Sequence, residues 1–211
     1  MTRKEQRKAW DEEMSQAHVV GEMWEAARRG RLEELKAFVV SGGDVDAQNR
    51  FGNTALLYAS SSGHLVVVEW LLDQGADVNY RSPREYHTGG KFSALHTAAA
   101  GGHAEIVRLL LNRGAKINTK DGHGRTALVT AIEENRPDVV ELLLGAGANV
   151  NLKGPDGWTP LRAAIFAKRL DVAKMLARRG ADIHQVEPLL GGTLLALAVS
   201  EGETASVEWL L

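Results

Sequence analysis

Residues 157–182 read GWTPLRAAIFAKRLDVAKMLARRGAD, and this stretch decides the fold. Thr159 can accept a hydrogen bond from a free amide at a helix start, and Pro160 suits the first helical position. Two apolar runs follow, each interrupted by polar residues, and Gly180 suits a left-handed helix end. The stretch therefore predicts two short helices in succession.

The same pattern recurs along the chain at a nearly fixed interval. The glycines that close the second helix are 33, 39, 33 and 33 residues apart, and they are Gly42, Gly75, Gly114, Gly147 and Gly180. The helix starts are 39, 33, 33 and 34 residues apart, and they are Thr54, Ser93, Thr126, Thr159 and Thr193. Both series lose register between Gly75 and Ser93, which indicates one insertion of six residues. Units of this length cannot each bury their own apolar face, so the core has to form by stacking.

These residues resemble the ankyrin repeat. The match is closest in residues 157–182 and in residues 121–151, which run from Asp121 and Gly124 through Leu142-Leu143-Leu144 to Asn151. The resemblance covers about residues 21–211 and implies an all-α solenoid of helix-turn-helix pairs with β-hairpins between them, one of them extended at residues 80–92. The implied units are about 21–49, 50–79, 80–118, 119–151, 152–184 and a truncated 185–211.

Side-chain size along each unit gives a physical reason for the stacking. The pairs Ala98-Ala99 and Ala163-Ala164 keep one face of the first helix thin, so that it can lie close to its neighbour. The second helix carries larger residues with one polar interruption, so we expect Glu141 to face solvent between buried apolar neighbours.

Composition narrows the class of protein. The chain has 211 residues, 44% hydrophobic and 25% charged, with a net charge of −2 and no cysteine. The near-neutral charge disfavours nucleic acid as the main partner. The lack of cysteine excludes a disulfide framework and favours a cytoplasmic setting. No apolar stretch approaches the roughly 20 residues needed to span a bilayer, so membrane insertion is not expected.

The two ends of the chain differ in character. Residues 1–20 are polar and their charges balance. Trp10, Met14 and Ala17 are spaced at i, i+4 and i+7, which predicts a helix with one apolar stripe. This helix is expected either to cap the first unit or to act as an arm that binds a partner. Residues 209–211 read WLL in the middle of a second helix. We expect a monomer. The apolar residues 209–211 predict that the chain either continues into further sequence or self-associates through this edge.

Catalytic motifs are weak. Residues 122–127 formally match the dinucleotide pattern G-x-G-x-x-A, but they lie at a repeat junction and not after a buried strand. His64, His96 and His103 occupy repeat positions at which, in ankyrin repeats, histidines are structural and hydrogen-bonded between units. Glu133 and Glu134 diverge on a helix and make a poor acid–base pair. We predict no catalytic residue, cofactor or metal site.

Recognition of another protein is the remaining function. In ankyrin arrays the hairpin tips and the exposed side of the first helices line a concave groove, and the residues predicted to bind a partner there and in the extended hairpin are Arg50, Phe51, Tyr86, Phe92, His123, Arg125, Trp158 and Phe166. Three of them, Phe51, Phe92 and Trp158, are aromatics expected at solvent-facing hairpin positions, as in a binding hot spot. Alternatively, each aromatic folds back onto the next repeat and stabilises the stack.

The extended hairpin carries two Tyr, two Arg, one Lys and one His, a composition suited to an acidic or phosphorylated partner surface, although an inserted loop of this size is also tolerated without a function. By resemblance alone, Asn79, Asn118 and Asn151 lie where many animal ankyrin proteins are hydroxylated. The predicted function is a noncatalytic protein-binding scaffold. A stoichiometric inhibitor of one enzyme and a targeting module of a larger protein are the alternatives.

Overall fold

The computed structural model describes residues 23–83, 90–186 and 192–211. Residues 23–29 are helical, and after them the chain forms pairs of short helices. The elements are α2 (Leu32–Val40), α3 (Ala55–Ser62), α4 (Leu65–Asp73), α5 (Ala94–Gly101), α6 (Ala104–Asn112), α7 (Ala127–Glu133), α8 (Pro137–Gly145), the 3-10 helix η1 (Pro155–Gly157), α9 (Pro160–Phe166), α10 (Leu170–Arg178), α11 (Leu194–Ser200) and α12 (Thr204–Leu210).

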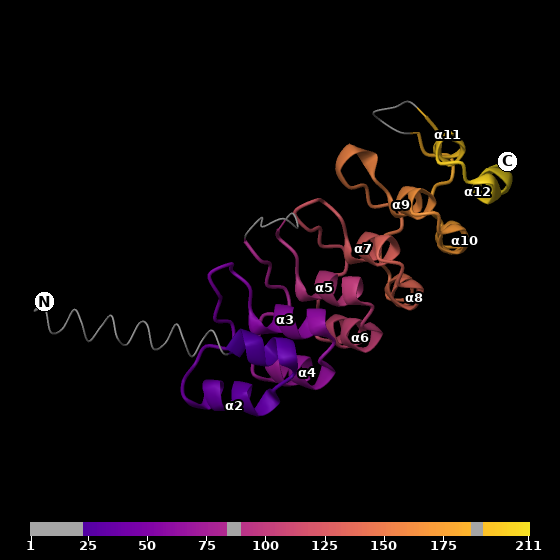
Figure 1. The fold of residues 1–211 in the computed structure, drawn as a ribbon. Coiled ribbons are helices and arrows are strands. Elements are labelled where there is room, and N and C mark those ends of the chain that lie inside the picture. The colour runs from indigo at the N-terminus through magenta and orange to yellow at the C-terminus, as the bar shows by residue number, and fades with distance from the viewer. Residues whose placement is uncertain (1–22, 84–89, 187–191) are drawn as a thin grey trace, which may run out of the picture.

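The helices stack in two layers along one curved row (Figure 1). The first helices α3, α5, α7, α9 and α11 pack against one another in chain order, and the second helices α4, α6 and α8 form the other layer. The connecting hairpins project from the same side of the row (Figure 1). The prediction of an all-α repeat solenoid is therefore confirmed.

The core follows the predicted division between small and large side chains. Ala98, Ala99, Ala163 and Ala164 are fully buried, so the first helices approach closely. The second helices bury larger residues, such as the fully buried Leu143, while Glu141 of α8 is exposed as expected. Apolar burial at these repeated positions joins neighbouring units into one continuous core.

The predicted helix starts are confirmed at all four threonines, and the predicted cap hydrogen bond forms at three of them. The side chains of Thr126, Thr159 and Thr193 accept a hydrogen bond from the amide three residues later. Thr54 does not, although it precedes α3 with the same extended backbone, and its buried hydroxyl has no hydrogen-bond partner within the described residues. At that position the cap prediction was wrong.

The second helices end as predicted in left-handed backbone. Gly147 has a φ of 87°, and its four equivalents lie between 86° and 91°. First helices end in the same conformation, mostly at glycine, but Asn135 and Lys168 take the place of glycine after α7 and α9 with φ of 56° and 61°. Side chains strain this conformation, so these two positions store a small instability.

Polar side chains lock each unit to the next. The imidazole Nε2 atoms of His64 and His103 bond the carbonyl oxygens of Arg28 and Ser61, 2.9 and 3.1 Å away in the preceding unit. The predicted structural role of these histidines is confirmed. Along the hairpins, an asparagine row joins units in the same way: the Oδ1 atom of Asn79 accepts from the amide of Lys116 at 2.9 Å, and equivalent bonds form at Asn118 and Asn151.

Asp46 takes the asparagine's place in the first hairpin of this row. Its carboxylate accepts from the amide of Asp77. Burial raises the pKa of Asp46, and the negative charges of Asp44 and Asp77 raise it further, whereas the hydrogen bond from the Asp77 amide acts to lower it.

Hydrogen bonds at the hairpin bases locate the inserted residues. In three hairpins the bonded pair is four residues apart, as in Asn49–Asn53, Asp121–Arg125 and Gly154–Trp158. In the hairpin between α4 and α5, the Ser82 amide donates to the Phe92 carbonyl ten residues later. The six extra residues therefore lie between Ser82 and Phe92. Residues 84–89, which include Tyr86, and the predicted arm at residues 1–20 lie outside the described residues.

The last unit leaves part of its apolar surface uncovered. Trp209 and Leu210 are half-buried against the core, whereas Leu211 is 88% exposed. Val199 of α11 is also exposed.

Candidate partner-binding site

Asp121 organises the hairpin between α6 and α7. Its Oδ1 atom accepts hydrogen bonds from the amides of His123 and Arg125 at 2.9 and 2.8 Å. Short polar side chains that accept a hydrogen bond from the backbone two residues later favour tight turns, and Asp121 stabilises the hairpin turn in this way. Asp121 is buried, so the turn is fixed from within.

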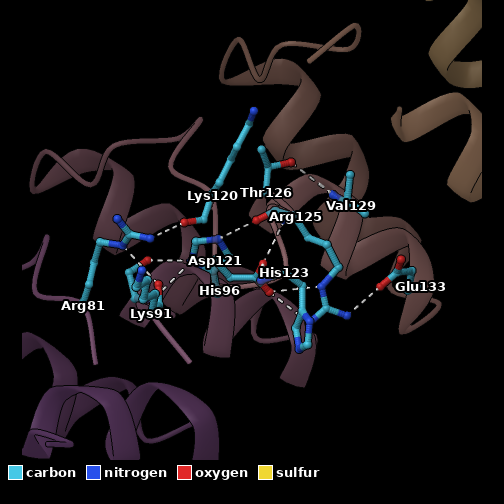
Figure 2. A network of polar contacts seen from close by, with 11 residues as sticks. Arg81, Lys91, His96, Lys120, Asp121, His123, Arg125, Thr126, Val129 and Glu133 are labelled. Carbon is cyan, nitrogen blue, oxygen red and sulfur yellow. Dashed lines mark hydrogen bonds and ion pairs between the residues drawn. The ribbon is translucent and has the colours of Figure 1, made fainter. Parts of the chain in front are cut away.

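Arg125 links this turn to the first helix of its unit. Its Nε and Nη2 atoms donate to Asp121 Oδ2 at 3.0 and 2.9 Å, and Nη1 donates to Glu133 Oε2 at 3.0 Å (Figure 2). Burial acts to lower the pKa of Arg125, but the carboxylates of Asp121 and Glu133 outweigh it and raise that pKa. Two carboxylates thus hold one guanidinium, and its charge is directed into the protein.

Two pockets lie on either side of Arg125. The first has a volume of about 330 Å³ and is lined by Leu57, Tyr58, Phe92, Thr97, Ala100 and Arg125, among others. The second, of about 320 Å³, is lined by Val129, Leu152, Pro155, Trp158, Glu133 and Arg125, among others. Arg125 lines both, so its rigid network forms the wall between them.

Three of the hairpin residues that line these pockets occupy one repeat position. Phe92, Arg125 and Trp158 are each the residue whose carbonyl accepts the bond at the hairpin base, next to the start of the first helix. Phe92 and Trp158 are half-buried and pack against the core. The expectation that they face solvent was wrong, because part of each side chain packs against the core. Phe51 and His123 lie two residues earlier, at the hairpin tip.

An aromatic cluster borders the second pocket. The rings of Trp158 and Phe166 meet edge to face, with centroids 5.4 Å apart. The Arg162 guanidinium lies 4.5 Å from the centroid of the Trp158 ring. Phe166 remains 50% exposed on α9, which is unusual for so large an apolar residue.

The first hairpin tip holds a smaller pair. The guanidinium of Arg50 lies 4.6 Å from the centroid of the Phe51 ring, and Phe51 is half-buried while Arg50 is exposed. His123 is exposed at its own tip. The structure therefore brings together Phe92, His123, Arg125 and Trp158 around the two pockets, with Phe166 against Trp158. Arg50 and Phe51 lie apart from the pockets, at the first hairpin tip.

Sequence reasoning missed Tyr58, Asp121 and Arg162 as parts of the site. The hydroxyl of Tyr58 accepts a hydrogen bond from Asn49 at 2.9 Å and closes one end of the first pocket. The available signal was positional for Tyr58, because its first-helix position carries Thr97, Thr130, Ala163 and Leu197 in the other units.

Ser93 and His96 resemble a catalytic pair in distance only. His96 Nδ1 accepts from the Ser93 amide at 3.3 Å and lies 2.9 Å from its hydroxyl, while Nε2 bonds the Arg125 carbonyl at 3.2 Å. Burial lowers the pKa of His96, against the opposing charge of Asp121. Both residues are buried, so the pair caps α5 and joins two units, which confirms the structural role predicted for His96.

Comparison with known families agrees with this architecture. A family model described as ankyrin repeats in three copies matches residues 23–121, 82–154 and 121–187. The chain belongs to the ankyrin repeat family. Ankyrin repeats are general protein–protein interaction modules, and this statement holds for the chain as well.

Individual relatives share only short segments with this ankyrin repeat protein. It is 49% identical over 55 residues to ankyrin repeat domain-containing protein 29 of Danio rerio, covering 26% of this chain and 18% of that protein. The human protein of the same name is 47% identical over 55 residues, with the same coverage. Alpha-latrotoxin-Lh1a of Latrodectus hasselti is 37% identical over 62 residues, or 29% of this chain and 4% of the toxin. The chain thus spans a minor part of these relatives.

Residues 23–83, 90–186 and 192–211 contain neither a helix suited to cross a membrane nor a cluster of metal ligands. None of their helices combines the length and apolar character that a membrane crossing needs. Across the same residues, no three His, Cys, Asp or Glu side chains are grouped so that they could hold a metal ion.

Proposed function

We propose that this chain is a noncatalytic scaffold that binds a partner protein on its concave side, over the two pockets that flank Arg125. The observation that carries the proposal is the pair of adjacent pockets with aromatic walls and a rigid polar wall between them. A preformed, partly apolar surface binds without a large cost in ordering the protein.

The size of the pockets indicates what enters them. Each lies at the lower end of the range found for ligand sites, about 300–1,000 Å³, and so suits one large side chain. Apolar or aromatic anchors of the partner would replace water against Phe92 in the first pocket, against Trp158 in the second, and against the exposed Phe166 beside Trp158. Anchors of this kind carry most of the binding free energy in protein interfaces.

The role of Arg125 in this proposal is to keep the pockets apart. Its guanidinium is bonded to Asp121 and Glu133 and needs no partner charge for compensation. Partner side chains therefore meet a fixed wall whose position does not depend on what is bound. Contacts from Arg50, Phe51 and His123 at the hairpin tips, and from Tyr86 in the extended hairpin, are proposed to extend the same surface.

A role as an enzyme is not proposed. The one Ser–His pair at hydrogen-bond distance among the described residues is buried and engaged in capping α5. A cytoplasmic location is proposed from the cysteine-free composition, and fractionation of native cells followed by immunoblotting tests it.

The experiment is affinity capture of partners from native cells with the wild type and with the double variant Trp158→Ala/Phe166→Ala. A matched control is Val40→Ala/Val66→Ala, which removes two exposed apolar side chains from second helices. We expect the control to retain a captured partner and the double variant to lose about tenfold or more in affinity for it, since each anchor contributes on the order of 2 kcal/mol. Equal affinity of all three proteins for every captured partner contradicts the proposal.

A further inference from the structure

Three cations form a row along the outer side of the hairpins. The Nη2 atom of Arg81 donates to the carbonyl of Lys120, and Nζ of Lys120 donates to the carbonyl of Lys153 at 2.8 Å. Arg81, Lys120 and Lys153 each precede the residue whose amide bonds across a hairpin base, so they are equivalent positions of successive units. We name them the cation row.

The cation row faces away from the concave pockets. Successive side chains in extended backbone point to opposite sides, and Asp121, which follows Lys120, lines the first pocket. Lys120 itself lines neither pocket. Figure 2 shows the Lys120 side chain running in the opposite direction from the Arg125 guanidinium. Each hairpin therefore has two distinct faces, one towards the groove and one that carries the cation row.

The charges of the row are not compensated. All three side chains are exposed, and no carboxylate lies within ion-pair distance of any of them in the described part of the chain. The hydrogen bonds of Arg81 and Lys120 go to carbonyl groups, which hold these two side chains in place without cancelling their charge. Lys91 and Lys116, also exposed, lie in the same hairpin region. Like charges held in register repel one another, and a bound anion relieves this repulsion.

We propose that the cation row is a second docking surface, which takes an acidic segment of a protein, rich in Asp and Glu. Cations at one equivalent position of three successive units present a line of positive charge that complements the carboxylates of an acidic segment. The net charge of −2 argues against a nucleic acid, whose binding depends on a strongly positive protein. The sequence pointed to acidic partners for residues 80–92 alone, and the structure extends this surface through Lys120 and Lys153 into the next two units.

The test measures fluorescence anisotropy of fluorescein-labelled oligoglutamate at low ionic strength. The variant Arg81→Gln/Lys120→Gln/Lys153→Gln is compared with Arg108→Gln/Arg178→Gln/Arg179→Gln, which removes the same net charge from exposed positions on the second-helix layer. We expect the row variant to bind roughly tenfold more weakly, the order for three exposed ion pairs, and the control to bind like the wild type. Added salt should weaken wild-type binding.

Further controls test whether the row variant folds and which surface and which class of polyanion are involved in binding. Arg81 and Lys120 donate structural hydrogen bonds, so circular dichroism must show a folded row variant. If it is unfolded, Lys153→Gln decides, because that side chain donates no hydrogen bond in the described residues, and it should weaken binding about twofold to threefold. The pocket variant Trp158→Ala/Phe166→Ala should leave oligoglutamate affinity unchanged, which separates this surface from the concave one. Equal weakening by the row and control variants overturns the proposal, as does tighter, row-dependent binding of oligothymidine with the same charge.

Discussion

Removal of the Arg125 guanidinium should destabilise the array more than any other single charge. Arg125→Met keeps most of the packing volume but breaks three side-chain hydrogen bonds to Asp121 and Glu133. The carboxylate of Asp121, only 5% exposed, then loses its counter-charge. Breaking a buried pair costs about 3–5 kcal/mol, and the 33% exposure of the Arg125 side chain reduces this, so we expect a loss of about 2–3 kcal/mol.

A double-mutant cycle with Asp121→Asn isolates the interaction. Asparagine retains the oxygen that accepts from the amides of His123 and Arg125, so the turn should survive while the ion pair is lost. Urea unfolding, fitted with a nearest-neighbour model because repeat arrays depart from two-state behaviour, gives the four free energies. We expect a coupling energy of about 1.5–2 kcal/mol. A coupling below about 0.5 kcal/mol would refute the rigid wall between the pockets.

Further predictions concern the locks between units. Because burial raises the pKa of Asp46, the folded state binds the proton of this carboxyl group more tightly than the unfolded state, and the stability of the fold falls as pH rises through the titration of Asp46. Asp46→Asn should therefore raise the free energy of unfolding by about 1 kcal/mol at pH 7 and by less at pH 3, as measured by urea titrations at both pH values. Asn135→Gly should stabilise by about 0.5–1 kcal/mol in the same assay, and a loss of stability would contradict the strain at its φ of 56°. Gly63→Ala would bring a Cβ within 2.6 Å of the His103 ring and should lower the free energy of unfolding by about 2–3 kcal/mol. Gly75→Ala, with no atom within 4 Å of the added Cβ, should lower it by only about 1–2 kcal/mol. Equal shifts in melting temperature for the two variants would argue against the histidine contact.

The fold could be predicted from sequence because its constraints are local and recur. A glycine with positive φ, a threonine before a helix and a pair of alanines each demand the same backbone wherever they appear. The regular spacing then converts local signals into a stack. Thr54 shows the limit of this reasoning, since the same residue at the same position makes no cap bond.

The site was harder to predict because it depends on which side chains pair across the groove. Arg125 was expected to bind a partner, but Asp121 and Glu133 hold its charge, and no sequence rule states this pairing. Phe92 and Trp158 were expected in solvent and are half-buried. Their partial burial follows from the geometry of the hairpins. This geometry is known only once the backbone hydrogen bonds at each hairpin base show which residues of successive units are equivalent.

The cation row could not be predicted from the sequence because the insertion hides the equivalence of its residues. The insertion places Lys120 thirty-nine residues after Arg81, whereas Lys153 follows at the usual step of thirty-three. Only the bonded pair Ser82–Phe92 shows that the extra residues lie beyond Arg81 and that the row is continuous.

The central claim, that the partner occupies the concave side, is tested most directly by site-specific crosslinking. A p-benzoylphenylalanine residue in place of Phe166 on α9, or in place of Val66 on α4, is irradiated in the presence of the captured partner. Both positions are exposed, and they belong to opposite helix layers. The account predicts a covalent adduct with the partner from position 166 and none from position 66, and adduct formation at position 66 alone would contradict it.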